Sequence, residues 1–267
     1  MKHEIVRIED PEDDRIAAYR DIRERDLIGR EGLFVAEGKV VLKVLFAARR
    51  FQPQSVLVLE NRLAGISDTL ELAPENMPVY VASQEVMDRI AGFNVHRGIL
   101  ALGRKRSPEG LASLLDRLPA SALVLLLVGI SNHDNMGSIF RNAAAFHADA
   151  VLLDQGCCDP LYRKSIRVSV GAVLKVPFAV GGSAEELLSD LQRAGFESIA
   201  LSPRGEFDIA ALDRPKRAAL VLGTEGPGLP QHILSATRTA RITMSEEFDS
   251  LNVATAAAIA LHRLWRR

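Results

Sequence analysis

Short, almost entirely apolar segments alternate with helical patterns along the C-terminal half of this 267-residue chain. The longest apolar segment, residues 122–130 (ALVLLLVGI), predicts a buried strand that ends near residue 128. We expect further strands over residues 150–153, 197–201, 218–222 and 240–243. We expect helices near residues 137–145, 165–170, 184–194 and 252–264. Because strands that are apolar on both faces must be covered on both faces, this pattern predicts an α/β domain with a parallel sheet.

The N-terminal half alternates in the same way between about residues 33 and 104. Strands are predicted over residues 32–36, 55–60, 78–82 and 98–104, and helices over residues 38–49, 83–90 and a stretch between the second and third strands. Ahead of them, residues 11–24 predict an amphipathic, charged helix. The charged, proline-flanked segment 105–119 suits a connection between domains. We therefore predict a smaller α/β domain over residues 1–107 and a parallel-sheet domain over residues 108–267.

The composition, 48% hydrophobic and 25% charged, is that of a folded protein and argues against intrinsic disorder. The longest apolar segment is too short to span a bilayer, and the first fourteen residues lack the apolar core of a signal peptide. We expect a cytoplasmic protein. The two cysteines, Cys157 and Cys158, are sequence neighbours, which rarely bridge, and no CxxC or HExxH spacing exists. We expect free thiols and no metal site.

The formal net charge of −1 argues against a uniformly basic surface that coats nucleic acid. Two local basic clusters remain, residues 104–106 (RKR) and a second group formed by Arg163, Lys164, Arg167 and Lys175. Each cluster suits phosphate binding, but charged groups of this kind more often form a solvated surface. Composition alone favours the solvated surface.

Because ligands of parallel α/β sheets bind at the carboxyl ends of the strands, the loops that leave the predicted strands are the candidate sites. The first loop, residues 131–137 (SNHDNMG), leads into a helix of Ile, Phe and Ala that carries Arg141. Asn135 suits the N-cap of that helix, and Arg141 then lies about one turn from its start. A salt bridge is the simpler role for Arg141, and phosphate recognition by its fork of donors is the functional one.

The second loop, residues 223–230 (GTEGPGLP), contains three glycines, which let a backbone approach a ligand closely. Its GxxGxG spacing matches neither a dinucleotide-binding GxGxxG nor a GxxxxGK[ST] phosphate loop. Glu225 is its only carboxylate, suited to a ligand contact or to a solvated turn.

The third loop, residues 245–252, ends with Ser250 and Asn252, both of them good helix N-caps. The alanine-rich segment VATAAAIALHRL that follows predicts a helix suited to tight packing or to a subunit interface.

In order, the three loops read NHDNMGSIFRNAAAF, LVLGTEGPGLP and ITMSEEFDSLNVATAAAIAL. They closely resemble the three motifs of the SpoU (TrmH) branch of the SPOUT RNA methyltransferases, over roughly residues 120–267. The segments REGLFVAEGKVVLKVL and FNVHRGILA more loosely resemble the ribosomal-protein-like substrate domain that precedes this catalytic domain in rRNA ribose methyltransferases.

The resemblance implies a deep C-terminal trefoil knot, a homodimer, and transfer of a methyl group from S-adenosylmethionine to a ribose 2′-hydroxyl in structured RNA. The extra N-terminal domain favours rRNA over tRNA. Carried over by position, the cofactor residues are Gly223, Gly226, Ile242, Met244 and Leu251. The catalytic residues are Arg141, Asn135, Glu225, Ser250 and Asn252, and no metal takes part. The resemblance gives Arg141 a part in activating the hydroxyl. Because a guanidinium normally keeps its proton, we expect Arg141 to clamp the phosphate next to the reacting ribose, and a role as the base stays open.

Four positions depart from the motifs of that branch. His133 and Thr243 stand where proline is common, and His147 and Glu246 stand where glycine is common. The departures at Thr243 and Glu246 put the shape of the cofactor loop in question. Two other functions stay open: a non-catalytic RNA-binding or ribosome-assembly protein that keeps the fold, and a methyltransferase that acts on a base.

Overall fold

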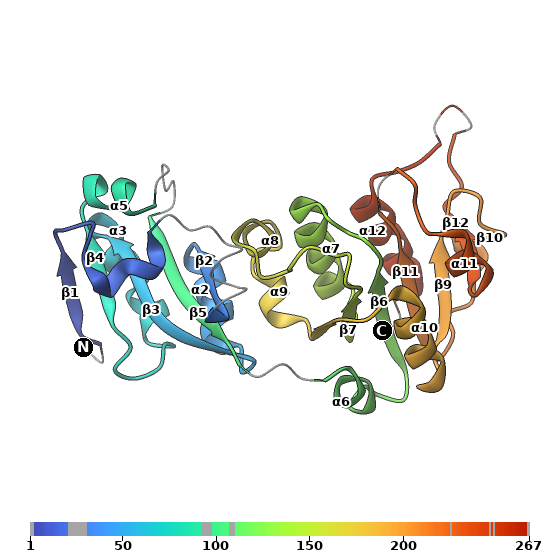
Figure 1. The fold of residues 1–267 in the computed structure, drawn as a ribbon, viewed down its shortest axis with the longest axis horizontal. Coiled ribbons are helices and arrows are strands. Elements are labelled where there is room, and N and C mark those ends of the chain that lie inside the picture. The colour runs from blue at the N-terminus through green and yellow to red at the C-terminus, as the bar shows by residue number, and fades with distance from the viewer. Residues whose placement is uncertain are drawn as a thin grey trace. The chain divides into compact units, whose positions relative to one another are not determined.

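The computed structural model describes residues 3–20, 31–91, 98–106, 110–224, 226–245, 247 and 249–265, and contains two compact units (Figure 1). The first unit consists of Met1–Ser107 and Leu161–Lys175, and the second of Pro108–Pro160 and Val176–Arg267. The division after residue 107 coincides with the predicted domain boundary. The segment 161–175, which the sequence places in the second domain, packs with the first unit.

The first unit has a five-stranded mixed sheet in the order β1-β4-β3-β5-β2. Its strands are β1 (Ile5–Ile8), β2 (Leu33–Glu37), β3 (Phe51–Leu59), β4 (Val79–Ala82) and β5 (Ile99–Lys105). Strand β4 runs parallel to β1 and β3, whereas β5 is antiparallel to β3 and β2. The four predicted strands are confirmed, and β1 was not predicted.

The helical elements of the first unit are η1 (Asp14–Tyr19), α2 (Lys39–Ala47), α3 (Glu60–Leu63), η2 (Ala64–Ile66), α4 (Ser67–Leu70), α5 (Gln84–Ala91), α8 (Arg163–Val168) and α9 (Ala172–Lys175). The amphipathic helix predicted over residues 11–24 is a 3₁₀ helix over Asp14–Tyr19, and residues 21–24 lie outside the described part of the chain. Tyr19 explains this short helix, because its buried hydroxyl is anchored to Ser55 Oγ (2.8 Å) and accepts from the Leu102 amide (3.1 Å).

Helix α8 joins the first unit through a buried ion pair. Arg163 Nη1 donates to Glu37 Oε2 at 2.8 Å, and Glu37 is only 4% exposed at the end of β2. A carboxylate buried this deeply needs a charged partner, and the helix that follows β7 supplies it. This contact is why residues 161–175 belong to the first unit.

The second unit contains a seven-stranded sheet in the order β10-β12-β9-β11-β6-β7-β8, and every pairing in it is parallel. Its strands are β6 (Ala122–Leu127), β7 (Ala150–Leu153), β8 (Phe178–Val180), β9 (Glu197–Leu201), β10 (Phe207–Asp208), β11 (Arg217–Leu222) and β12 (Arg238–Arg241). The predicted parallel α/β domain is therefore confirmed. Strands β8 and β10, of three and two residues, were too short to predict.

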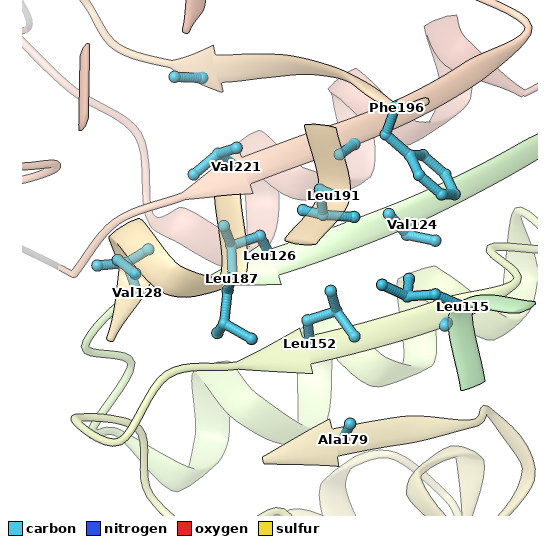
Figure 2. Close-up of a cluster of buried hydrophobic side chains, with 14 of the residues drawn as sticks. Leu115, Val124, Leu126, Val128, Leu152, Ala179, Leu187, Leu191, Phe196 and Val221 are labelled. Carbon is cyan, nitrogen blue, oxygen red and sulfur yellow. The ribbon is translucent and has the colours of Figure 1, made fainter. Parts of the chain in front are cut away.

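Helices cover both faces of this sheet, as its apolar strands require. They are α6 (Leu111–Asp116), α7 (His133–Ala145), α10 (Ala184–Arg193), α11 (Gln231–Ser235) and α12 (Val253–Leu264), with the 3₁₀ turn η3 (Ile209–Ala211). Figure 2 shows one face, where Leu115 of α6 and Leu187 and Leu191 of α10 pack on Val124 and Leu152 of the strands. Because side chains alternate along a strand, the remaining residues of these strands face α7 and α12. No helix within the described ranges has both the length and the apolar character that crossing a membrane requires.

Candidate active site

The carboxyl ends of β6 and β7 are held together by one buried carboxylate. Asp154 is 8% exposed, and its Oδ1 accepts from the amides of Gly129 (3.0 Å) and Gly156 (3.1 Å). Gly129 has a φ of +66°. It lies beside Thr224, as the distance of 3.7 Å from a Cβ added at Gly129 to Thr224 Cβ shows. The loops after β6, β7 and β11 therefore meet at one edge of the sheet, as the parallel arrangement predicts.

Helix α7 begins earlier than predicted. Asn132 is its N-cap, with Oδ1 accepting from the amides of Asp134 (2.8 Å) and Asn135 (3.3 Å). The prediction that Asn135 caps this helix was wrong, because an asparagine directly after the strand already satisfies the first free amides. Asn135 instead lies in the first turn of α7 and is 7% exposed.

Asn252 joins the first and third loops. It caps α12 with Oδ1, which accepts from the amides of Ala254 (2.9 Å) and Thr255 (3.2 Å), as the sequence predicts. Its Nδ2 donates to Asn135 Oδ1 at 2.9 Å. Ser250 does not cap the helix; its hydroxyl donates to Asp249 Oδ1 at 3.4 Å. A second link between the same helices runs from Asn142 Nδ2 to the carbonyl of Ala254 at 2.8 Å.

The glycine-rich loop after β11 folds back on itself, with an antiparallel bridge between Thr224 and Gly228. Gly226 and Gly228 have φ values of +85° and +69°, which favour glycine. At Gly223 a Cβ would lie 2.6 Å from the backbone nitrogen of Leu229, so this position has no room for a side chain. Glu225, the predicted catalytic carboxylate, lies outside the described residues.

A cavity of about 1090 Å³ opens at this edge of the second unit. All five residues assigned to the cofactor line it: Gly223, Gly226, Ile242, Met244 and Leu251. Ser250 and Asn252 of the predicted catalytic set line it too. The structure thus gathers residues from the second and third loops around one space, and Asn135 reaches that space through Asn252.

Sequence reasoning missed a third wall of the cavity, formed by Ser202, Pro203 and Arg204. These residues directly follow strand β9, so the rule that ligands bind at the carboxyl ends of strands could have found them. Arg204 and Asp249 are the two charged side chains among the described lining residues. A cavity lined by both polar and apolar residues, with one cation and one anion, suits a ligand that carries both charges and has some apolar surface.

Two of the described predicted site residues, Asn135 and Arg141, lie outside the cavity lining, and of these Asn135 is linked to it through Asn252. Arg141 is exposed and is the ninth residue of α7, which begins at His133. The prediction that it lies about one turn from the helix start was therefore wrong. Arg141 lies six positions after Asn135 in the helix. At 3.6 residues per turn this spacing places the two side chains roughly 120° apart around the helix axis, on different faces. An exposed guanidinium here is available to a ligand that approaches from solvent.

None of the described side chains forms a group of three or more His, Cys, Asp or Glu residues suited to a metal ion. The cavity itself offers side-chain hydrogen-bonding groups, backbone next to glycines and the two charged side chains Arg204 and Asp249.

The model of the SpoU rRNA methylase family matches residues 122–262, which contain all three loops and the cavity. The chain belongs to the SpoU rRNA methylase family. The resemblance read from the three motifs is confirmed, and the protein is a member of a family of RNA methyltransferases. A relative from Mycobacterium bovis, named as an uncharacterized tRNA/rRNA methyltransferase, is 41% identical over 96% of this chain and 90% of its own length.

Solved structures show the same two-part fold. The crystal structure of an RNA 2′-O ribose methyltransferase has a TM-score of 0.78 and 26% identity and covers 98% of each chain. The AdoMet-bound rRNA methyltransferase from Sinorhizobium meliloti has a TM-score of 0.78 and 23% identity, covering 99% of this chain and 98% of its own. The SpoU methyltransferase AviRb from Streptomyces viridochromogenes, in complex with AdoMet, has a TM-score of 0.78 and 21% identity, with coverages of 93% and 94%.

Proposed function

We propose that this SpoU-family protein transfers the methyl group of S-adenosylmethionine (AdoMet) to a ribose 2′-hydroxyl of structured RNA, with rRNA as the substrate. The observation that carries the proposal is the cavity lined jointly by Gly223, Met244, Leu251 and Asn252, residues from two of the family's three motifs. The hydrogen bond from Asn252 to Asn135 ties the remaining motif to that cavity.

The ribose 2′-oxygen is supported as the acceptor by two structural neighbours whose names mention it. One is the RNA 2′-O ribose methyltransferase that matches both parts of this chain. The other concerns 2-OH methylation of C/U34 on tRNA; it is 27% identical and covers 55% of this chain, with a TM-score of 0.50. The N-terminal unit, two segments of which resemble the substrate domain of rRNA ribose methyltransferases, favours rRNA.

The residues present fit the cofactor. The cavity, about 1090 Å³, is slightly larger than the usual range of small-molecule sites, about 300–1,000 Å³, and so has room for AdoMet. Glycines at Gly223 and Gly226 leave the backbone accessible, and Ile242, Met244 and Leu251 supply apolar surface. AdoMet carries an ammonium and a carboxylate, which match a lining that holds one anion and one cation, and its adenine ring has flat faces that suit apolar side chains. When bound, it supplies an electrophilic methyl group.

The protein's own residues then have two tasks, to position the ribose and to ease removal of the hydroxyl proton. Arg141 binds the adjacent phosphate with its fork of donors, and its positive charge lowers the pKa of the nearby ribose hydroxyl. Asn252 is held by Asn135 and by the cap of α12, so it presents a fixed amide beside Ser250 at the cavity. Glu225 completes the catalytic set that the resemblance implies.

We extend the proposal to the whole molecule in the way that the resemblance implies. Residues 1–107 select the RNA, residues 108–267 form the methyltransferase domain with a trefoil knot in its C-terminal part, and the protein acts in the cytoplasm as a homodimer without a metal.

The deciding experiment incubates the protein and radiolabelled AdoMet with unmodified total RNA, followed by mapping of 2′-O-methylated nucleotides. We expect label at a single site or a few sites in rRNA. Label on a base atom would favour base methylation, and calorimetry without any AdoMet binding would favour a non-catalytic RNA-binding protein. Label in protein or small molecules would overturn the proposal.

A further inference from the structure

One wall of the cavity is built from two segments that follow neighbouring strands of the sheet. Ser202 and Arg204 come after β9, and Ile242 and Met244 come after β12. Strand β12 ends at Arg241, so the ladder of the sheet stops just before the second segment reaches the cavity. Something other than strand pairing must fix the positions of Ile242 and Met244.

Thr243 supplies a fixing contact on the side away from the cavity. Ile242 and Met244 line the cavity, whereas Thr243 between them is exposed. The Thr243 hydroxyl donates to Asp208 Oδ2 at 2.5 Å. In an extended segment successive side chains point to opposite sides, so this hydrogen bond holds Thr243 outward and turns both neighbours toward the cavity.

Asp208 is itself held in place. It forms strand β10, paired with Arg241 of β12, and its Oδ1 accepts from the amide of Ala210 at 2.7 Å. The pKa of Asp208 is held below its usual range. The largest cause is the hydrogen bond from Thr243, followed by the one from Ala210 and by the charges of Arg241 and Arg263. The carboxylate is thus the charged acceptor that Thr243 meets at neutral pH.

Arg241 ties the loop after β9 to the same place. Its Nη1 donates to the carbonyls of Gly205 (2.8 Å) and Glu206 (2.7 Å). Gly205 packs so closely on β12 that a Cβ there would lie 2.2 Å from the carbonyl carbon of Ala240. One guanidinium and one glycine therefore fix the loop that carries Arg204 against the strand that carries Ile242.

We propose that Asp208, Arg241 and Thr243 form a polar clamp that positions the cofactor-contacting segment Ile242 to Met244. These three are positioning residues, since none of them is among the described residues that line the cavity. The inference rests on the proposed function, because it assigns the cavity to AdoMet. The related motif commonly has proline at position 243, and the ring of a proline restrains the backbone. In this chain the hydrogen bond from Thr243 to the charged Asp208 supplies that restraint.

The test compares Thr243→Val, which removes the hydroxyl and keeps the branched shape, with Thr243→Ser, which keeps the hydroxyl. Binding of AdoMet and of S-adenosylhomocysteine is measured by calorimetry, and kcat is measured at saturating AdoMet. We expect Thr243→Val and Asp208→Ala each to raise the Kd and the KM for AdoMet by about tenfold, the equivalent of about 1.4 kcal/mol, with kcat close to normal. Thr243→Ser should stay within about twofold of the wild type.

The matched control is Thr237→Val. The Thr237 hydroxyl donates to the carbonyl of Ile233 at 2.9 Å in the same unit and lies outside the described cavity lining. Its removal should leave the Kd for AdoMet unchanged. The double variant Asp208→Ala/Thr243→Val should bind no more weakly than Asp208→Ala, because that substitution already removes the acceptor of the Thr243 hydroxyl.

Wild-type protein that fails to bind AdoMet would overturn the proposed function. Wild-type binding together with an unchanged Kd in folded Thr243→Val would overturn the clamp alone. If Thr243→Val does not fold, Asp208→Ala takes its place: it removes the acceptor of the Thr243 hydroxyl, and an unchanged Kd in the folded variant would equally overturn the clamp.

Discussion

Asn252 donates a hydrogen bond of 2.9 Å to Asn135, a residue 117 positions earlier in the chain. One amide group thereby serves two purposes, since Asn252 Oδ1 caps α12 while Nδ2 holds the first turn of α7. The start of each helix is fixed by the other. The geometry of the proposed catalytic residues thus depends on a contact that no local segment contains.

Asn252→Ser separates these two purposes, because serine is a good N-cap but its short side chain cannot reach Asn135. We expect a loss of unfolding free energy of about 1–3 kcal/mol, the cost of depriving a buried polar group of a partner, and a marked loss of methyl transfer. The measurement is a double-mutant cycle with Asn135→Ala, using chemical denaturation and single-turnover assays. Effects of the two substitutions that simply add would contradict the coupling.

Arg141→Lys keeps the charge and removes the planar fork of donors. If Arg141 clamps a phosphate with two hydrogen bonds, methyl transfer should fall by about 10²–10³-fold, as when a transition-state donor is lost. The Kd for AdoMet should not change, since Arg141 is absent from the described cavity lining. Arg193→Lys, at an exposed arginine of α10 that pairs with Asp190, is the control. Near-normal transfer by Arg141→Lys would argue against the clamp on phosphate.

Gly223→Ala tests the glycine-rich loop. The new Cβ would lie 2.6 Å from the Leu229 nitrogen and 2.7 Å from the Gly228 carbonyl carbon, so the backbone that borders the cavity must shift. We expect AdoMet binding to weaken by at least about tenfold, measured by calorimetry. Gly65→Ala is the control, because a Cβ added at Gly65 would have no neighbouring atom within 4 Å. Equal affinities in both variants would show that the cavity does not depend on this loop.

The two cysteines give a prediction about pH. Burial is the main cause that raises the pKa of Cys157, and the negative charge of Asp154 adds to it. Burial, with a smaller contribution from Asp159, raises the pKa of Cys158 to about 11. Since the thiolate is the reactive form, alkylation of folded Cys157→Ser protein should be slow at pH 8 and should rise toward pH 11 rather than pH 9. Unfolding should restore the profile of an ordinary thiol. By linkage, the stability that the protonated thiols contribute is complete below about pH 9 and is lost as the pH rises through 11.

Peptide-resolved mass spectrometry at several pH values measures this alkylation. A folded-state profile with its midpoint near pH 9 would contradict the predicted shift of the Cys158 pKa. Cys158→Ser offers the complementary variant, in which the slower Cys157 alone reports.

Strands β6, β7, β9 and β11 were predictable because each is mainly apolar and is followed by a polar loop or turn. Residues 150–153 and 197–201 are strands with the predicted bounds. The strand predicted over residues 240–243 instead spans Arg238–Arg241. It ends two residues early, and Thr243 donates a hydrogen bond to Asp208 instead of continuing the ladder. Helix α7 begins before the predicted start because its cap, Asn132, directly follows the strand.

The sequence alone determined the alternation of strands and helices, the parallel sheet, and the family, since these depend on local periodicity and on ordered motifs. The tertiary structure decided which residues meet. It placed Arg163 against Glu37 and Asn252 against Asn135, and it put Thr243 outside a cavity that Ile242 and Met244 line. Hydrogen bonds of this kind join segments up to 126 positions apart. No local pattern encodes such a contact, because only the packing of the complete chain brings its two partners within reach.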